Sequence, residues 1–303
     1  MDHPNVPREL YPFESHYLDL NGLGYHYLDE GSGHPVLMVH GNPTWSFYYR
    51  NLAIALRDTH RVIVPDHMGC GLSAKPTDAE YNYTLEQRVD DLDALVEHLG
   101  LEGPITLVLH DWGGMIGMAW ASRHPDRVAR IVLLNTGAFH LPETKPLPWQ
   151  LWLVRNTAMG ALLVRGMNAF SAGATRMACT RKRLDKATRD AYTAPYDTWH
   201  NRIATLRFVQ DIPLRPEDAG YDLITRVQDN LSQFDAKPVM ICWGDKDFVF
   251  DHHFLAQWQK HLPNARVHRF ADCGHYILED ADEEVITLVR DFLSSTQVET
   301  SAA

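Results

Sequence analysis

One segment of the sequence places an acidic side chain where a nucleophile could act. Residues 105–114 read Ile-Thr-Leu-Val-Leu-His-Asp-Trp-Gly-Gly, so an apolar run typical of a buried strand passes through Asp111 into paired glycines. Helical periodicity then follows over residues 114–123. A strand, a tight turn and a helix together hold the side chain at the turn out for nucleophilic attack. A carboxylate there suits displacement at a saturated carbon, because it is ionised at neutral pH and needs no base to deprotonate it.

The turn departs from the usual G-x-S-x-G elbow at two positions. Asp111 occupies the central position, and Leu109 replaces the first glycine. Taken alone, an Asp directly before a helix is more often an N-cap, whose side chain accepts a hydrogen bond from the first helical turn. The nucleophile interpretation therefore depends on the other motifs of the chain.

Three further motifs each follow an apolar run. They are His40-Gly-Asn-Pro-Thr-Trp45, Trp243-Gly-Asp-Lys-Asp247 and Cys273-Gly-His-Tyr276. In enzymes of the α/β-hydrolase fold, the first position supplies a second oxyanion-type donor, and nucleophile, acid and histidine come in this chain order. An ordinary turn would explain each motif alone, but together they predict Asp111 as the nucleophile and His275 as its partner.

Two aspartates compete for the role of the acid. Asp247 lies further beyond the strand end than Asp245, so its side chain can turn back toward the histidine, and we expect Asp245 to be structural. Some enzymes of the α/β-hydrolase fold place the acid after the strand that corresponds here to residues 131–134. This chain has Asn135 there, which cannot carry a negative charge, so we predict Asp247.

The remaining pattern predicts the sheet that positions these residues. Alternating stretches at residues 15–20 and 25–30 indicate an opening antiparallel pair. Compact apolar runs follow at residues 36–39, 62–64, 105–109, 131–134, 239–243 and 267–270. Helical periodicity in most of the intervals, for example at residues 85–99, favours a mostly parallel eight-stranded sheet with helices on both faces.

The interval between residues 134 and 239 is too long for a loop in a compact domain. We predict a helical cap at residues 138–232, inserted between two parts of the core at 1–137 and 233–303, and lying over the carboxyl ends of the strands. Within it, we expect an amphipathic or buried helix at residues 151–170, where Arg155, Asn156 and Arg165 argue against a membrane span. Contact of this helix with a membrane surface or a lipid substrate is the minor alternative. Residues 175–189 are rich in Arg and Lys and predict a solvated helix face, with a partner-binding patch as the alternative.

Composition excludes several classes of function. A net charge of −11 argues against a nucleic-acid partner. The four cysteines are widely spaced and predict small buried residues more than disulfides. Residues 1–7 lack the features of a signal peptide, so we expect a cytoplasmic protein, and the small polar tail at 294–303 should be frayed.

The sequence gives no recognised metal or cofactor motif. Asp251-His-His253 lacks a ligand spacing of known type and is more typical of a helix start. Gly69-Cys-Gly71 is too short to cradle a phosphate. We therefore expect no cofactor and no metal.

The motifs resemble those of the haloalkane dehalogenases across nearly the whole chain. In that family the nucleophile corresponds to Asp111, the base to His275 and the acid to Asp247, while Asn42 and Trp112 correspond to the paired donors that bind the departing halide. The cap segments at 195–202 and 208–213 resemble the third dehalogenase subfamily. The closest resemblance is to the neighbouring β-lactone decarboxylases of bacterial long-chain olefin biosynthesis.

This resemblance implies conversion of a cis-3,4-dialkyl β-lactone to a cis-alkene and carbon dioxide through a covalent Asp111 intermediate. Attack of Asp111 on the ring carbon and attack on the carbonyl are both open at this point. The resemblance also implies a hydrophobic small-molecule substrate and either pathway-enzyme partners or a homo-oligomer. The alternatives are an alkyl-halide hydrolase and an inactive hydrolase-fold binding protein. An epoxide hydrolase, which would need cap tyrosines such as Tyr192 or Tyr196, is less favoured.

Overall fold

The computed structural model describes residues 6–101 and 103–296, in which eight strands form one sheet. The strands are β1 (His16–Leu20), β2 (Leu23–Glu30), β3 (Pro35–Val39), β4 (Arg61–Pro65), β5 (Ile105–Asp111), β6 (Val128–Thr136), β7 (Val239–Gly244) and β8 (Arg266–Phe270). Their order across the sheet is β1-β2-β4-β3-β5-β6-β7-β8. The pairs β1–β2 and β2–β4 are antiparallel, and all other neighbours are parallel. The predicted mostly parallel eight-stranded sheet is confirmed.

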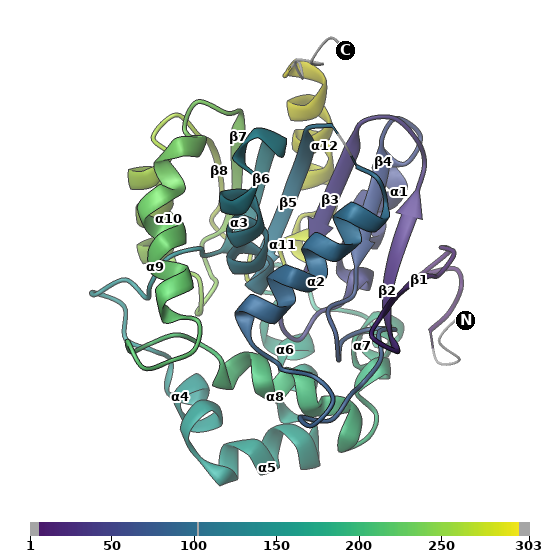
Figure 1. Ribbon diagram of the computed structural model, residues 1–303, viewed down its shortest axis with the longest axis vertical. Helices are drawn as coiled ribbons and strands as arrows, with labels where there is room; N and C mark the ends of the chain where they lie inside the picture. Colours follow the sequence, from purple (N-terminus) through teal and green to yellow (C-terminus); the bar gives the residue numbers. More distant parts are fainter. Residues whose placement is uncertain (1–5, 102, 297–303) are drawn as a thin grey trace.

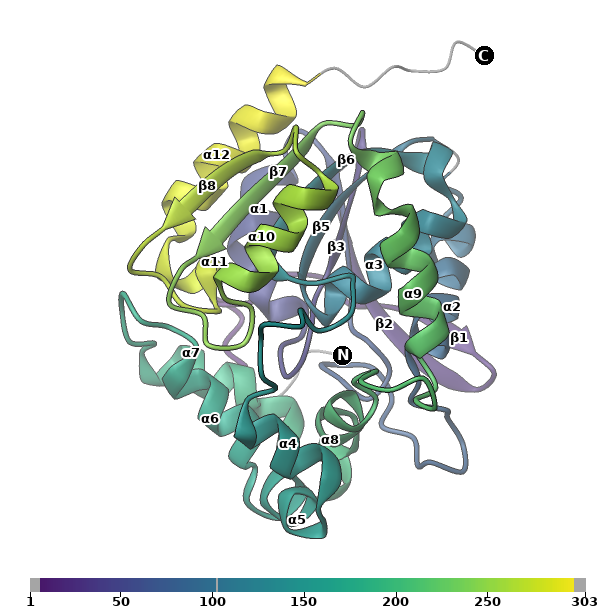
Figure 2. The same cartoon turned by 90° about the vertical axis from the view of Figure 1, so that its left-hand side faces the viewer.

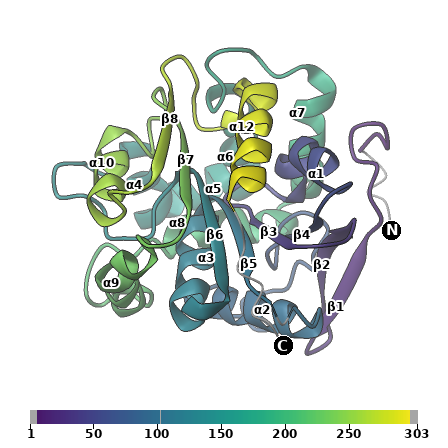
Figure 3. The same ribbon diagram turned by 90° about the horizontal axis from the view of Figure 1, so that it is seen from above.

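Side-chain alternation along the strands divides the core into two layers. In β5, Leu107 and Leu109 belong to one apolar cluster, while Val108 between them belongs to the other. Helices α2 (Leu85–His98), α3 (Trp112–Arg123), α9 (Tyr221–Asn230) and α10 (His252–His261) pack on the first face, and α1 (Arg50–Leu56), α11 (Ile277–Asp280) and α12 (Asp282–Ser295) pack on the second (Figure 3). The sheet is therefore buried on both faces, as its continuous apolar runs require.

Five cap helices lie between β6 and β7. They are α4 (Trp149–Asn156), α5 (Ala158–Met167), α6 (Ala169–Met177), α7 (Lys186–Thr193) and α8 (Ile203–Gln210). Figures 1 and 2 show them gathered beyond one end of the sheet. Helix α9, which also falls within the predicted insertion at 138–232, instead packs with α3 on the face of the sheet. The exact limits of the cap stay a prediction.

The prediction of one helix over residues 151–170 is wrong. The chain bends twice there, first at Thr157, which is extended and accepts a hydrogen bond from the backbone N–H of Gly160, and again at Asn168, whose φ is 52°. Three short helices, α4, α5 and α6, result. Local capping therefore overrides the continuous apolar pattern.

The prediction of one basic helix over residues 175–189 is also wrong. Helix α6 ends at Met177 because the carbonyl of Ala178 accepts a hydrogen bond from the backbone N–H of Tyr276 in the core. Asp185 then caps the start of α7. Between the two helices, Arg181 and Lys182 form ion pairs with carboxylates of the core, so part of this basic segment holds the cap on the core.

Two structural findings bear on the predictions for the cysteines and the chain ends. All four cysteines are free, and three of them are buried. Among the described residues, no helix is long and apolar enough to cross a membrane. The predictions for residues 1–5 and 297–303 fall outside the described part of the chain, although α12 extends to Ser295, inside the tail expected to be frayed.

Candidate active site

The chain turns sharply at Asp111. Strand β5 is buried along its whole length and ends at this residue, and α3 begins with Trp112. Asp111 has φ 51° and ψ −125°, outside the regions that most residues favour, and its side chain makes no capping hydrogen bond to the helix. The N-cap alternative therefore does not describe Asp111. The strained backbone instead presents its carboxylate above the end of the sheet.

The unusual Leu109 of the elbow is accommodated from the following helix. A Cβ atom at Gly117 would lie 2.4 Å from Cδ2 of Leu109. In the usual elbow, a glycine at position 109 leaves space between the strand and the helix. Here Gly117 has no side chain, so the same space holds the side chain of Leu109.

The loop after β3 holds one oxygen of the nucleophile. The backbone N–H of Asn42 donates a 2.5 Å hydrogen bond to Oδ1 of Asp111. A Cβ atom at Gly41 would lie 2.0 Å from the same oxygen, so only glycine allows this close approach. Because Oδ1 is held by this hydrogen bond, Oδ2 is the oxygen that the predicted nucleophile could use in an attack.

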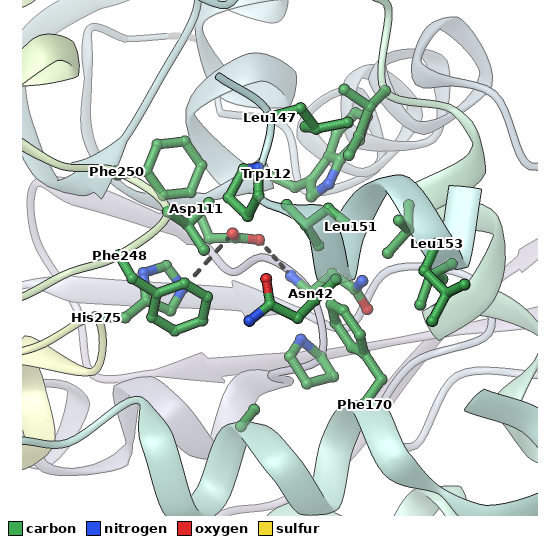
Figure 4. Close-up of a pocket in the computed structure, with 18 of the residues that line it drawn as sticks. Asn42, Asp111, Trp112, Leu147, Leu151, Leu153, Phe170, Phe248, Phe250 and His275 are labelled. Atoms are coloured by element: carbon green, nitrogen blue, oxygen red, sulfur yellow. Dashed lines mark hydrogen bonds and ion pairs between the residues drawn. The ribbon is translucent and has the colours of Figure 1, made fainter. Parts of the chain in front are cut away.

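His275 lies between the predicted nucleophile and the predicted acid, and Figure 4 shows its contact with Asp111. Its Nε2 lies 3.5 Å from Oδ2 of Asp111, and its Nδ1 lies 2.7 Å from Oδ2 of Asp247. Asp247 is buried and also accepts hydrogen bonds from the side chain of Asn135 and the backbone N–H of Val249. Asp245 instead pairs with Arg269 near the surface.

The charge of His275 follows from these two carboxylates. Burial alone lowers the pKa of the imidazole, but Asp247 and Asp111 outweigh it and raise the pKa of His275 to about 10. The free site therefore holds an imidazolium between two carboxylates at neutral pH.

The two predicted anion donors are Asn42, which precedes Asp111 in the sequence, and Trp112, which directly follows it. Asn42 donates one amide N–H to the carbonyl of Thr205 in α8, which fixes the orientation of the amide. The indole of Trp112 makes no hydrogen bond within the described residues, and it lines the same cavity as Asn42 and Asp111. Both side chains are therefore placed to donate to an anion in that cavity.

Sequence reasoning missed Arg88 behind Trp112. Its fully buried guanidinium lies 3.9 Å from the ring centroid of Phe208 and 5.8 Å from that of Trp112, and it pairs with Asp211 at the end of α8. Burial raises the pKa of Asp211 to about 6, against the opposing effect of Arg88. No short motif marks Arg88, because an arginine in an amphipathic helix normally indicates a solvated face.

Hydrogen bonds through Asp280 connect the loop that carries His275 to the cap. Asp280 accepts hydrogen bonds from the backbone N–H groups of Gly274, Thr180, Arg181 and Lys182. His110, next to the nucleophile, donates from Nε2 to the carbonyl of His275 at 2.9 Å. These contacts join residues far apart in the sequence, so no local pattern could have indicated them.

An apolar cavity of about 320 Å³ opens above Asp111. Figure 4 shows Asn42, Asp111 and His275 converging in it, surrounded by aromatic and aliphatic side chains. Leu147, Leu151, Leu153, Phe170, Phe248 and Phe250 are among the lining residues. A few polar groups at one point of an apolar cavity are typical of a site for a hydrophobic small molecule.

Other sequence candidates do not reach this cavity. Tyr192 donates to Glu279 and Tyr196 to the carbonyl of Thr44, and neither tyrosine lines the cavity, so an epoxide-opening role has no support. Asp251 and His253 lie in a cluster with His252, but the carboxylate of Asp251 caps α10 and pairs with Lys145. The predicted helix start at Asp251 is confirmed.

Comparisons with known proteins agree with this architecture. Residues 34–282 match the family described as the alpha/beta hydrolase fold. The haloalkane dehalogenase DatA from Agrobacterium tumefaciens C58 superposes with a TM-score of 0.84 at 25% identity, covering 94% of this chain and 97% of that one.

Proteins similar in sequence show which group of this fold the chain belongs to. A protein of Shewanella oneidensis named cis-3-alkyl-4-alkyloxetan-2-one decarboxylase is 59% identical, covering 95% of this chain and 91% of its own length. A protein of the same name from Xanthomonas campestris is 49% identical, covering 93% and 97%. Haloalkane dehalogenase 2 of Mycobacterium bovis is 30% identical, covering 93% and 95%. This chain therefore belongs to the α/β-hydrolase-fold family, within the haloalkane dehalogenase-like group that includes the cis-3-alkyl-4-alkyloxetan-2-one decarboxylases.

Proposed function

We propose that this protein converts a cis-3,4-dialkyl β-lactone to a cis-alkene and carbon dioxide, with Asp111 as nucleophile. The observation that carries the proposal is the 59% identity, over 95% of the chain, to a protein named for decarboxylation of such an oxetan-2-one. The side chains that this chemistry needs lie together in one apolar cavity, where Asp111 and His275 face Asn42 and Trp112.

In the first step, Oδ2 of Asp111 attacks ring carbon 4, which bears the ring oxygen. The bond between carbon 4 and that oxygen breaks, and the oxygen leaves as part of a carboxylate on carbon 3. The product is an alkyl ester of Asp111 with inverted configuration at carbon 4. The amide of Asn42 and the indole of Trp112 hold the new carboxylate.

In the second step, the bond from carbon 3 to the carboxylate breaks and carbon dioxide leaves. Its electron pair forms the double bond between carbons 3 and 4, and the bond to Oδ2 breaks to return the Asp111 carboxylate. Inversion followed by anti elimination gives a cis-alkene from a cis-lactone. The apolar lining favours this step, because the charge of the carboxylate disperses as carbon dioxide forms.

His275 serves this cycle as an imidazolium. With its pKa raised by the neighbouring carboxylates, it keeps a positive charge 3.5 Å from Oδ2 of Asp111 and stabilises that oxygen as it leaves. Hydrolysis of the ester would instead require a neutral imidazole to activate water.

The geometry supports attack at the ring carbon over attack at the carbonyl. Acyl-transfer enzymes of this fold bind the oxygen of the attacked carbonyl with backbone N–H groups, one of which comes from the loop after β3. Here the N–H of Asn42 already binds Oδ1 of the nucleophile. A saturated carbon needs no such donor.

A haloalkane dehalogenase is the second candidate, because the Asn42 and Trp112 donors would equally hold a halide and the fold matches DatA. A paired turnover assay on the purified protein separates the two functions. One arm supplies a cis-3,4-dialkyl β-lactone and follows alkene, and the other supplies 1-bromoalkanes and follows bromide. We expect rapid alkene formation with slow or no bromide release. Rapid bromide release without alkene would establish the second function instead.

A further inference from the structure

The cap carries an unusual distribution of charge. The chain contains 39 Asp and Glu residues, yet residues 144–184 contain none. The same stretch includes seven basic residues, which are Lys145, Arg155, Arg165, Arg176, Arg181, Lys182 and Arg183. Residues 144–184, which include helices α4, α5 and α6, therefore form an acid-free basic lobe on an otherwise acidic protein.

This lobe also exposes most of the large apolar side chains that face solvent. Ten such side chains are exposed in the described part of the chain, and six of them lie on α4, α5 and α6. We call the five on α4 and α5 the cap tip, which comprises Trp149, Trp152, Met159, Leu162 and Met167. Their exposure runs from 51% to 71%. Figures 1 and 2 both place α4 and α5 at the end of the molecule opposite the end of α12.

The spacing within each helix puts these side chains on shared faces. Trp149 and Trp152 are three residues apart in α4, and Met159 and Leu162 are three apart in α5, so each pair points the same way. Trp199 packs beside α5, where a Cβ atom on Gly166 would lie 3.6 Å from its ring, and Trp199 is itself 48% exposed. The exposed apolar surface is therefore continuous with an additional tryptophan.

Part of the basic charge of the lobe is free to act outward. Lys145, Arg155, Arg181 and Lys182 pair with carboxylates outside the acid-free stretch. Arg165, Arg176 and Arg183 form no ion pair with a carboxylate among the described residues, and the first two donate to backbone carbonyls. Arg165 lies on α5, the helix that also carries Met159 and Leu162 of the exposed apolar face. An apolar face with tryptophans and such an arginine complements a bilayer with anionic headgroups, where aromatic rings and arginine stems sit at the interface.

Helices α4 and α5, which carry the cap tip, also form part of the wall of the active-site cavity. Leu151 and Leu153 of α4, and Leu163 and Val164 of α5, line it from the inside. Trp149 belongs both to the cavity lining and to the exposed cap tip, so the cavity reaches the surface there.

We propose that the cap tip docks on an anionic bilayer surface and that the cavity receives its substrate from the lipid phase. The docking is independent of the reaction, whereas the entry of substrate rests on the proposed function with a long-chain lactone. A lipid surface fits this face better than an acidic protein partner, because the cap tip exposes five large apolar side chains while Arg165 is the one arginine of α4 and α5 without an ion pair among the described residues.

The test compares two double variants of the full chain in flotation with lipid vesicles. Met159→Glu with Leu162→Glu changes the cap tip at residues that do not line the cavity. Tyr17→Glu with Ile54→Glu is the matched control, since it adds the same charge at two exposed apolar residues of the core. Vesicles of equal parts phosphatidylglycerol and phosphatidylcholine supply the anionic surface, and pure phosphatidylcholine is the comparison.

We expect the unmodified protein and the control variant to float with the anionic vesicles. The fraction bound by the cap-tip variant should fall by about tenfold or more, with an unchanged circular dichroism spectrum. No binding by the unmodified protein, or equal binding by the cap-tip variant, would overturn the proposal. A protein that is oligomeric in sedimentation and becomes monomeric only in the cap-tip variant would assign this face to a second copy, and would also overturn it.

Substrate entry is tested separately with lactone turnover. A short-chain lactone in solution should react equally with all three proteins, while a long-chain lactone dissolved in anionic vesicles should react more slowly only with the cap-tip variant. Equal rates in the vesicles would overturn lipid-phase entry. Absence of alkene with every protein and substrate would refute the proposed function while leaving the docking result intact.

Discussion

The backbone N–H of Asn42 donates a 2.5 Å hydrogen bond to Oδ1 of Asp111, across 69 residues of sequence. This bond joins the loop after β3 to the elbow after β5, two strands that are neighbours in the sheet. Acyl-transfer enzymes of this fold use such a backbone N–H to bind the substrate, whereas here it binds the proposed nucleophile, Asp111. Oδ1 is thereby held, and Oδ2 is the oxygen that the proposed attack would use.

Gly41→Ala tests the need for this close approach. The new Cβ would lie 2.0 Å from Oδ1 of Asp111, so the carboxylate must move. We expect the rate of alkene formation to fall by about 100-fold, as a displacement of about 1 Å at a reacting group can cause. Gly103→Ala, whose Cβ would meet nothing within 4 Å, is the control and should leave the rate unchanged. A fully active Gly41→Ala protein would contradict the role of the bond to Asn42.

The two neighbouring aspartates give a second matched pair. Asp247→Asn removes the charge beside Nδ1 of His275, and we expect turnover to fall by about 100-fold or more. Asp245→Asn removes only a surface pair with Arg269 and should change turnover by less than about threefold. Steady-state rates of alkene formation decide the assignment, and a greater loss from Asp245→Asn would reverse it.

The charge of His275 predicts the dependence on pH. Its pKa is raised to about 10 in the folded protein from an unfolded value of about 6.5. The stabilisation from its charged form is therefore complete below pH about 6.5 and is lost as the pH rises through about 10. Urea unfolding across this range should show that loss in the unmodified protein and not in His275→Gln.

The same protonation distinguishes the two chemistries. Alkene formation, which uses the imidazolium, should keep its kcat/KM until the pH approaches about 10 and then decline. If alkene formation instead rose as His275 lost its proton, the histidine would be acting as a base and the elimination mechanism would be wrong.

Leu109 and Gly117 should be energetically coupled. Gly117→Ala places a methyl group 2.4 Å from Cδ2 of Leu109, and overpacking of this kind destabilises the fold by about 1–3 kcal/mol. In a Leu109→Ala background the methyl group has space, so the same change should cost less. A double-mutant cycle by urea unfolding measures the coupling, and additive effects would show that the two residues do not share the space.

The sequence predicts the sheet well because its signals are local. Each buried strand is a compact apolar run, and each site motif lies at the end of such a run, so Asn42, Asp111 and His275 could be brought together from chain order alone. The choice of Asp247 over Asp245 also rested on a local argument about distance from the strand end, and the structure places Asp247 against His275.

The cap was less accessible to prediction because tertiary contacts decide its breaks. The apolar pattern runs on through Thr157 and Asn168, where the helices end. Thr205 and Arg88 lie in helices with no motif, and only folding brings them beside Asn42 and Trp112. Similarly, the basic residues Arg181 and Lys182 gave no sign that they would pair with acids about a hundred positions away.

The proposed mechanism requires that the substrate becomes covalently attached to Asp111, and rapid-quench mass spectrometry detects such an adduct. The protein is mixed with excess cis-3,4-dialkyl β-lactone, quenched in acid at increasing times and digested. We expect the peptide containing Asp111 to gain the mass of the intact lactone before alkene accumulates, and the Asp111→Asn protein to give neither adduct nor alkene. Alkene formed at the normal rate by Asp111→Asn, or an adduct on another residue alone, would contradict the proposed mechanism.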